Sequence, residues 1–241
     1  MSLGSATGYN KDALSHFQKT SKYPIRPRSY EHFCGLAFAL DAVGERWALL
    51  VVRELLAGPR RFSDLMAGLP GVATNTLTSR LEELEQHGLI SRQQLPPPAA
   101  SAVYELTERG QGLEPAIVEL VRWATPQVAR SDRRKLAPLR ASWLAIALKA
   151  FFSPAKARKA QGQVVLELPT GALSVEVKEG ALEIRDRSPT DRPAASLRCP
   201  EELVIALITG AVTLVQATKQ PGVVLQGDPK DFSRVLTAFQ R

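Results

Sequence analysis

The sequence predicts an α+β protein of two domains: a helical N-terminal domain that ends in a β-hairpin, and a C-terminal domain with a five-stranded sheet. Apolar residues recur with the 3.6-residue period of helices from residue 34 onwards, and with the two-residue period of strands beyond residue 160. A chain of 241 residues is long enough for two domains of ordinary size. We expect an N-terminal arm over 1–30, a first domain over 31–130 and a second domain over 131–241.

The composition is that of a globular protein, with 44% hydrophobic and 23% charged residues. There is no apolar stretch of about 20 residues and no charged-then-apolar start, so we expect a soluble, cytoplasmic protein without a membrane partner. Cys34 and Cys199 are too few for a disulfide scaffold, and His16, His32 and His87 complete no metal site with them. We therefore expect no metal and no cofactor, and we expect Cys34 to be a buried thiol.

The N-terminal elements follow from apolar spacing and from residues that stop helices. Apolar residues at i, i+4 and i+7 predict four helices, which end near Gly44, Gly58, Pro70 and Gly88. Thr107 is the expected cap of a further long helix. The predicted helices span 36–43, 47–55, 62–69, 74–86 and 108–130, with a short one near 12–19, and the predicted strands span 89–95 and 102–106 around three prolines at 96–98.

The C-terminal elements follow from alternating apolar residues between turn residues. Residues 164–168 and 173–177 alternate in this way, and Pro169-Thr170-Gly171 and Glu179-Gly180 are the expected turns. The predicted strands span 164–168, 173–177, 182–184, 195–198 and 223–226, and the predicted helices span 143–152, 201–209 and 230–239. Helices 201–209 and 230–239 can cover the apolar face of the strands.

Helices followed by a proline-tipped hairpin are typical of a winged helix-turn-helix, which places the 74–86 helix in the DNA major groove. Its apolar residues share one face and are expected to pack: Leu77, Leu81 and Leu84. Short polar residues and one arginine lie elsewhere on its N-terminal half, where they suit contacts with bases and phosphates: Asn75, Thr76, Ser79 and Arg80. The alternative is an ordinary solvent-facing helix, because the acidic residues further along it would repel phosphate.

The formal net charge of +7 leaves DNA binding open. The excess of Lys and Arg lies in residues 1–33 and 111–160 rather than around the 74–86 helix. A basic middle segment is equally typical of a solvated linker helix, so charge alone does not decide between the two interpretations.

The N-terminal domain resembles the HxlR-type winged-helix regulators in the runs "ALDAVGERWALLVVRELLAGPRRFSDLMAGLPGVATNTLTSRLEELEQHGLISR" and "VYELTERGQGL". The resemblance implies a homodimer on a roughly palindromic operator in double-stranded DNA, with dimer contacts from an N-terminal helix and the 108–130 helix. Residues 96–102 lack the basic residue that the family often carries at the hairpin tip, so nearby arginines become the phosphate candidates. The expected DNA contacts are Thr74, Asn75, Thr76, Thr78, Ser79, Arg80, Arg60, Arg61 and Arg92. Cys34 aligns with a cysteine that senses oxidants in some members, although their following proline is Gly35 here.

The C-terminal domain looks like the sterol carrier protein type-2-like fold in the runs "VVLELPTGALSVEVKEGALEI" and "LRCPEELVIALITGAVTLVQATKQPGVVLQGDPKDFSRVLTAF". The resemblance implies a five-stranded sheet with helices on one face and an apolar cavity between them. The hypothesis that follows is that a small apolar ligand in this cavity modulates DNA binding. The expected ligand contacts are Val164, Leu166, Val175, Val177, Ile205, Ile208, Leu236 and Phe239.

Three alternatives stay open: a purely structural or dimerising C-terminal domain, a ligand-independent architectural DNA binder, and a lipid-binding protein in which this domain is the main functional unit. An enzyme is not expected. All three histidines precede residue 88, so no Ser-His-Asp or Cys-His arrangement is available in the C-terminal domain, and no Walker-type phosphate loop occurs.

Overall fold

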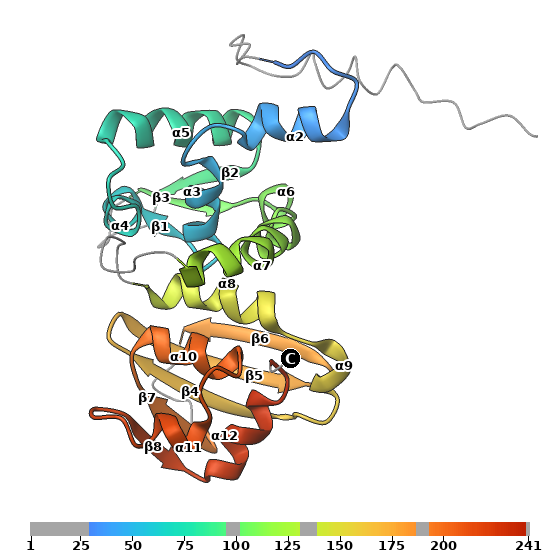
Figure 1. Cartoon of the computed structure of the whole chain (residues 1–241). Helices are drawn as coiled ribbons and strands as arrows, with labels where there is room; N and C mark the ends of the chain where they lie inside the picture. The colour runs from blue at the N-terminus through green and yellow to red at the C-terminus, as the bar shows by residue number, and fades with distance from the viewer. Residues whose placement is uncertain (1–28, 95–101, 131–138, 187–192, 240–241) are drawn as a thin grey trace, which may run out of the picture.

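The structure is a computed structural model that describes residues 29–94, 102–130, 139–186 and 193–239 (Figure 1). It contains a helical body with a small sheet and, below it in the figure, a second body with a larger sheet. Three expectations lie wholly or largely outside the described residues: the arm over 1–30, its short helix near 12–19 and the hairpin tip at 96–98. Residues 131–138, which belong to the basic segment 111–160, also lie outside them. The domain boundary at 130/131 remains a prediction.

The N-terminal body has the order of elements of a winged helix-turn-helix. Its helices and strands are α2 (Gly35–Val43), α3 (Ala48–Leu55), β1 (Arg60–Arg61), α4 (Phe62–Gly68), α5 (Thr74–Gln86), β2 (Ile90–Gln94), β3 (Ala102–Leu106), α6 (Glu108–Gln111) and α7 (Glu114–Arg130). The strands form an antiparallel sheet in the order β1-β3-β2. A core of fully buried residues, including Val51, Leu65 and Leu77, holds the helices against this sheet.

The predicted single helix over 108–130 is wrong, because two helices occupy this span. Thr107 caps α6 as expected, since its hydroxyl oxygen accepts a hydrogen bond from the Gly110 N–H at 3.1 Å. Gly110 lies so close to the backbone that a β-carbon there would be 2.0 Å from the Leu89 carbonyl oxygen. The chain then turns at Gly112, and α7 begins one residue before Pro115, which suits a first helical turn because proline lacks the N–H that a helix interior requires.

The C-terminal body contains α8 (Ala141–Phe151), α9 (Pro154–Ala157), β4 (Gly162–Leu168), β5 (Gly171–Lys178), β6 (Ala181–Asp186), β7 (Ala195–Arg198), α10 (Glu201–Ile208), α11 (Leu214–Ala217), β8 (Val224–Gly227) and α12 (Pro229–Leu236). The five strands lie in the order β6-β5-β4-β7-β8, with β4 and β7 parallel and the other neighbours antiparallel. The α+β class, all five strands and the three main helices were predicted, whereas the single-turn α9 and α11 were not.

Helix α8 lies between the two bodies and contributes to both hydrophobic cores (Figure 1). Leu144 and Leu148 are buried with the sheet, α10 and α12, whereas Ile146 is buried with α3, α5 and α7. Side chains on opposite sides of one helix therefore join the two bodies. Within the described residues, no helix combines the length and apolar character needed to cross a membrane.

Candidate nucleic-acid interface

Helix α5 is held by its apolar face and presents a polar face to solvent. Leu77, Leu81 and Leu84 are buried as predicted. The exposed residues on the N-terminal half of the helix are Thr74, Asn75, Thr78 and Ser79, and Thr76 is half-buried. The N-cap residue is Ala73, which offers no side chain to the first N–H groups of the helix. A helix start without a capping side chain at the N-cap, beside short polar side chains, suits contact with phosphate and base edges.

Local hydrogen bonds leave part of this polar face available. The Asn75 side-chain oxygen accepts a hydrogen bond from the Thr76 N–H at 2.9 Å, and the Thr78 hydroxyl donates to the Thr74 carbonyl oxygen at 3.0 Å. The amide nitrogen of Asn75 makes no hydrogen bond to any described residue. An amide with one end fixed and the other end open can donate to an adenine or to a phosphate.

Arg80 is engaged within the protein in this structure. Its guanidinium lies 2.5 Å from the Glu83 carboxylate and 3.8 Å from that of Glu45, and its side chain is only 14% exposed. The pair with Glu83 lies within α5, and the longer one with Glu45 connects α5 to the turn between α2 and α3. The predicted contact of Arg80 with DNA requires the side chain to leave Glu83, and it stays a prediction.

The three phosphate candidates near the hairpin do not share one face. Arg60 and Arg92 both lie opposite Tyr104 in the sheet, and the Arg92 guanidinium lies 5.9 Å from the Tyr104 ring centroid. Arg61 lies opposite Val103, which places it on the other face because neighbouring strand residues point in opposite directions. Arg60 and Arg92 therefore lie on the same face of the sheet, one on each side of Tyr104, and Arg61 lies on the other face.

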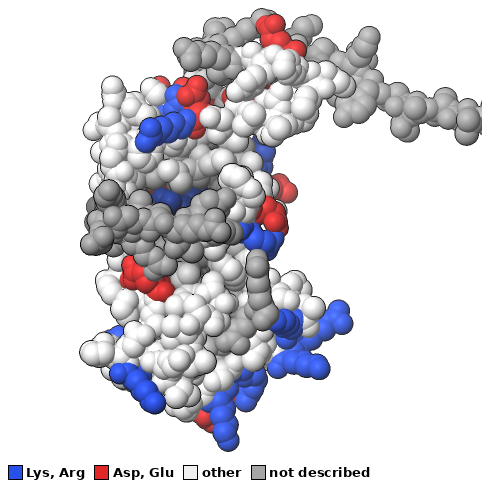
Figure 2. Space-filling model, in the orientation of Figure 1, with Lys and Arg blue, Asp and Glu red and all other residues white. Residues whose placement is uncertain are grey.

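Charge is distributed unevenly between the two bodies in the view of Figure 2. Acidic and basic side chains are mixed over the helical body, whereas basic side chains predominate around the lower part of the C-terminal body. Exposed basic residues in that body include Lys156, Arg158, Lys159, Lys230 and Arg234. In this view the basic side chains gather away from α5, and the start of α5 is distinguished by short polar residues rather than by a basic patch.

The expected apolar cavity in the C-terminal body is a void of about 20 Å³. Six of the eight predicted ligand contacts line it: Val164, Leu166, Val175, Ile208, Leu236 and Phe239. Val177 and Ile205 do not line it. Helices α8, α10 and α12 pack closely on the sheet, and the space that remains is about that of one water molecule.

Cys34 is exposed, so the expectation of a buried thiol is wrong. It is the N-cap residue of α2, where the nearby backbone N–H groups of Ala37 and Leu36 lower the pKa of the thiol. The apolar spacing of α2 suggested burial, but most of that apolar face is exposed in the single chain. Cys199 is the buried cysteine, and burial together with the charge of Glu201 raises its pKa to about 12.

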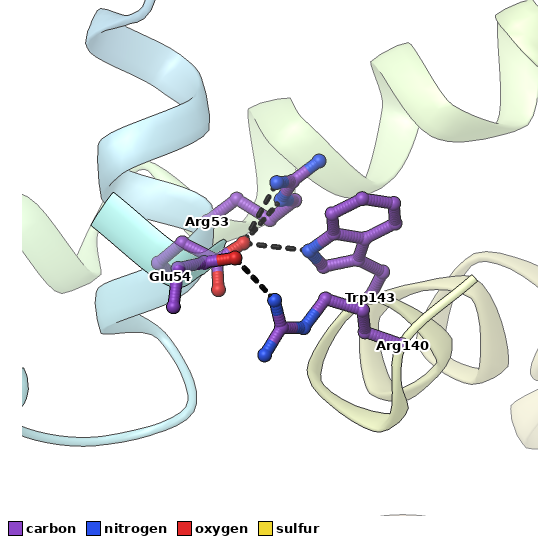
Figure 3. A network of polar contacts seen from close by, with 5 residues as sticks. Arg53, Glu54, Arg140 and Trp143 are labelled. Carbon is purple, nitrogen blue, oxygen red and sulfur yellow. Dashed lines mark hydrogen bonds and ion pairs between the residues drawn. The ribbon is translucent and has the colours of Figure 1, made fainter. Parts of the chain in front are cut away.

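A polar contact between α3 and α8, which the sequence analysis missed, joins the helix-turn-helix to the C-terminal body (Figure 3). The Trp143 indole N–H donates to the Glu54 carboxylate at 2.6 Å, and the Arg53 guanidinium donates to the same oxygen at 2.7 Å. Arg53 also lies 4.2 Å from the Trp143 ring centroid, and Arg140 donates to the Ala67 carbonyl oxygen at the end of α4. The sequence did carry a signal for this contact, because Glu54 interrupts the apolar residues of α3. In the structure its side chain is buried, with 4% of the residue exposed.

Comparison with known proteins gives two family matches that together extend from residue 42 to residue 240. The HxlR-like helix-turn-helix family matches residues 42–132, and the SCP-2 sterol transfer family matches residues 127–240. The uncharacterised HTH-type transcriptional regulator YvaP of Bacillus subtilis is 39% identical over 36% of this chain and 81% of its own length. A regulator of Synechocystis is also 39% identical, over 37% of this chain and 66% of its own length, which is just under two thirds.

Among solved structures, the reduced form of the transcriptional regulator YodB from Bacillus subtilis is 32% identical. The superposition covers 42% of the present chain and 100% of the YodB chain, with a TM-score of 0.37. From the sequence matches, the chain belongs to the HxlR-like helix-turn-helix family, and its C-terminal part matches the SCP-2 sterol transfer family.

Proposed function

We propose that the protein is a transcriptional regulator that binds double-stranded DNA in a sequence-specific manner, with α5 in the major groove. The observation that carries the proposal is the exposed polar face at the start of α5, which its buried leucines orient outwards. The HxlR-like family match and the regulators among the relatives support it. The proposed place of action is the cytoplasm, where a bacterial-type regulator meets chromosomal DNA.

The test is selection of bound duplexes from a random pool, followed by affinity measurements on the selected sequence by fluorescence anisotropy. Asn75→Ala is expected to weaken binding by about 1–3 kcal/mol, the range for a good base contact. Gln86→Ala is the matched control, since it removes an amide from the far end of the same helix and should change binding by less than about 0.5 kcal/mol. Unchanged affinity in both Asn75→Ala and Ser79→Ala would contradict this recognition face.

We further propose that the regulator is a homodimer on a roughly palindromic operator. Two sets of exposed large apolar residues support this proposal, one around α2 and one on α7: Tyr30, Phe33, Leu36, Phe38 and Leu40, and Leu120 and Trp123. Exposed apolar surface of this kind is typical of a partner interface. An isologous dimer would present two copies of α5 to two half-sites.

Light scattering tests the dimer with a substitution on α7. Leu120→Glu places a charge on the exposed apolar face and should give monomers at micromolar concentration, while the wild type stays dimeric. Val121→Glu is unsuitable, because Val121 packs against the core of its own chain and the substitution would disturb the fold. A monomeric wild type at that concentration would refute the proposed dimer.

The SCP-2 family match supports a finer proposal, in which an apolar ligand inside the C-terminal body modulates DNA binding. Ligand pockets usually enclose at least about 300 Å³, so a ligand could enter the void of about 20 Å³ only if α10 and α12 moved away from the sheet. Displacement of a fluorescent fatty acid, with operator affinity measured in parallel, tests this proposal. Without saturable binding, the C-terminal body is a structural part of the regulator, and the proposed DNA binding is unaffected.

A further inference from the structure

A larger space lies between the two bodies. This interdomain crevice has a volume of about 300 Å³ and is bounded by the Leu56–Gly58 turn after α3, by α8, and by β5 and β6. Its walls come from both bodies, and Ile146, which joins α8 to the N-terminal core, is among them. Domain interfaces are common positions for small-molecule sites, and this volume reaches the lower end of the range for such sites.

Apolar and polar side chains contribute about equally to the walls of the crevice. Leu56 and Ala57 line it from the N-terminal body, Ala145 from α8, and Leu173 and Ile184 from the sheet. Each of these five side chains is at least partly withdrawn from solvent. One water molecule occupies about 30 Å³ in the liquid, so the crevice could hold about ten waters. A ligand with about ten non-hydrogen atoms is of this size. One small ring with a short substituent is of this size.

The charged groups of the crevice are paired, which favours a neutral ligand. Arg185 at the end of β6 lines the crevice, and its guanidinium lies 3.1 Å from the Glu183 carboxylate and 3.5 Å from that of Glu176. The Lys149 ammonium pairs closely with the Glu114 carboxylate, and their side chains are 33% and 30% exposed. A charged ligand would have to separate this pair, whereas a hydroxyl group can accept from the ammonium and donate to the carboxylate at once. The Ser142 hydroxyl also lines the crevice and makes no hydrogen bond to any described residue, which adds a second donor and acceptor.

We propose that the interdomain crevice is a binding site for a small, neutral, hydroxyl-bearing ring compound, and that its occupancy changes the affinity for DNA. The turn at Leu56–Gly58 begins two residues after Glu54, whose carboxylate accepts from Trp143 on α8. A ligand bound between this turn and α8 would therefore change the relative position of Glu54 and Trp143, whose hydrogen bond joins the C-terminal body to α3. Coupling requires that the ligand prefer one arrangement of α3 and α8, and this half of the inference rests on the proposed regulator function.

Binding is tested first without DNA, by calorimetric titration of the full chain with 4-ethylphenol. Saturable binding of one molecule per chain is expected, and ethylbenzene, which lacks the hydroxyl, should bind about tenfold more weakly. Ala57→Leu and Ala145→Leu fill the crevice from its two sides and should each weaken binding by about tenfold or more. Ala155→Leu on the exposed surface of α9 is the matched control and should leave binding unchanged.

Lys149→Met tests the polar end, because it keeps the length of the side chain and removes the ammonium. It should reduce the preference for 4-ethylphenol over ethylbenzene. The site is overturned by an absence of saturable binding at about 1 mM, or by binding that is equal in the wild type and both folded filling variants. Circular dichroism shows which variants are folded.

The regulatory half is tested by anisotropy with the selected duplex, with and without 4-ethylphenol. A shift in affinity that Ala57→Leu abolishes is the expected result. Ligand binding with unchanged DNA affinity overturns the coupling and leaves the crevice site intact. If no duplex is selected at all, the proposed regulator function fails together with its coupling, while the DNA-free titration still decides whether the site exists.

Discussion

Replacing Trp143 with phenylalanine should destabilise the protein through one buried hydrogen bond. The substitution removes the indole N–H that donates to the Glu54 carboxylate at 2.6 Å. Because Glu54 is only 4% exposed, a water molecule cannot readily replace the lost N–H donor. A hydrogen bond to a charged group contributes about 1.5–3 kcal/mol, and the weaker contact of Arg53 with a smaller ring adds about 0.5 kcal/mol. We expect the free energy of unfolding to fall by about 2–3.5 kcal/mol.

Urea denaturation followed by circular dichroism measures this change, and a double-mutant cycle with Glu54→Gln isolates the contact. The coupling energy between positions 54 and 143 should be about 1–3 kcal/mol. Val215→Ala is the surface control, because this valine on α11 is 66% exposed and its truncation should change stability by about 0.5 kcal/mol or less. If the effects of Trp143→Phe and Glu54→Gln add to within about 0.5 kcal/mol, the proposed energetic role of the contact is refuted.

Three further predictions follow from buried neighbours and shifted thiols. Gly68→Ala should cost about 1–3 kcal/mol in urea denaturation, because its β-carbon would lie 2.5 Å from the Glu54 carboxylate; a neutral effect would argue against the position of that carboxylate. Leu207→Ala should cost about 2–5 kcal/mol and enlarge the small void, and a cost under about 1 kcal/mol would mean that α10 is loosely packed. The backbone N–H groups at the start of α2 lower the pKa of Cys34, so its alkylation by iodoacetamide should reach half of its maximal rate below the pH typical of a free thiol. Cys199, whose pKa is raised to about 12, should stay unmodified in the folded protein. Mass spectrometry of the labelled peptides distinguishes the two cysteines.

Local chemistry accounts for the elements that were predicted closely from the sequence. Helix α5 spans Thr74–Gln86 as predicted, because Gly88 marks its end and three leucines mark its buried face. The hairpin at residues 169–171 has turn residues between two alternating strands, and it forms as expected. The helix break near Gly112 was missed even though Pro115 is a local signal for a new helix start.

Long-range partners account for what could not be predicted. The pairing of Arg80 with Glu83 needs only a helix, but whether the arginine faces DNA or the protein depends on where α2 and α3 lie. Glu54 and Trp143 are 89 positions apart, and no periodicity connects them. The size of a cavity depends on how closely helices pack, which a pattern of apolar residues does not specify.

The double role of α8 has a consequence for cooperativity. The two family matches overlap at residues 127–132, so a division of the chain based on them would assign α8 wholly to the C-terminal part. A fragment that ends there would lack Ile146 and would expose apolar surface of the helix-turn-helix core to water. Unfolding of either body exposes apolar surface of the other through α8, so the full chain should unfold in one calorimetric transition. A stabilising change in one body should therefore raise the melting temperature of both.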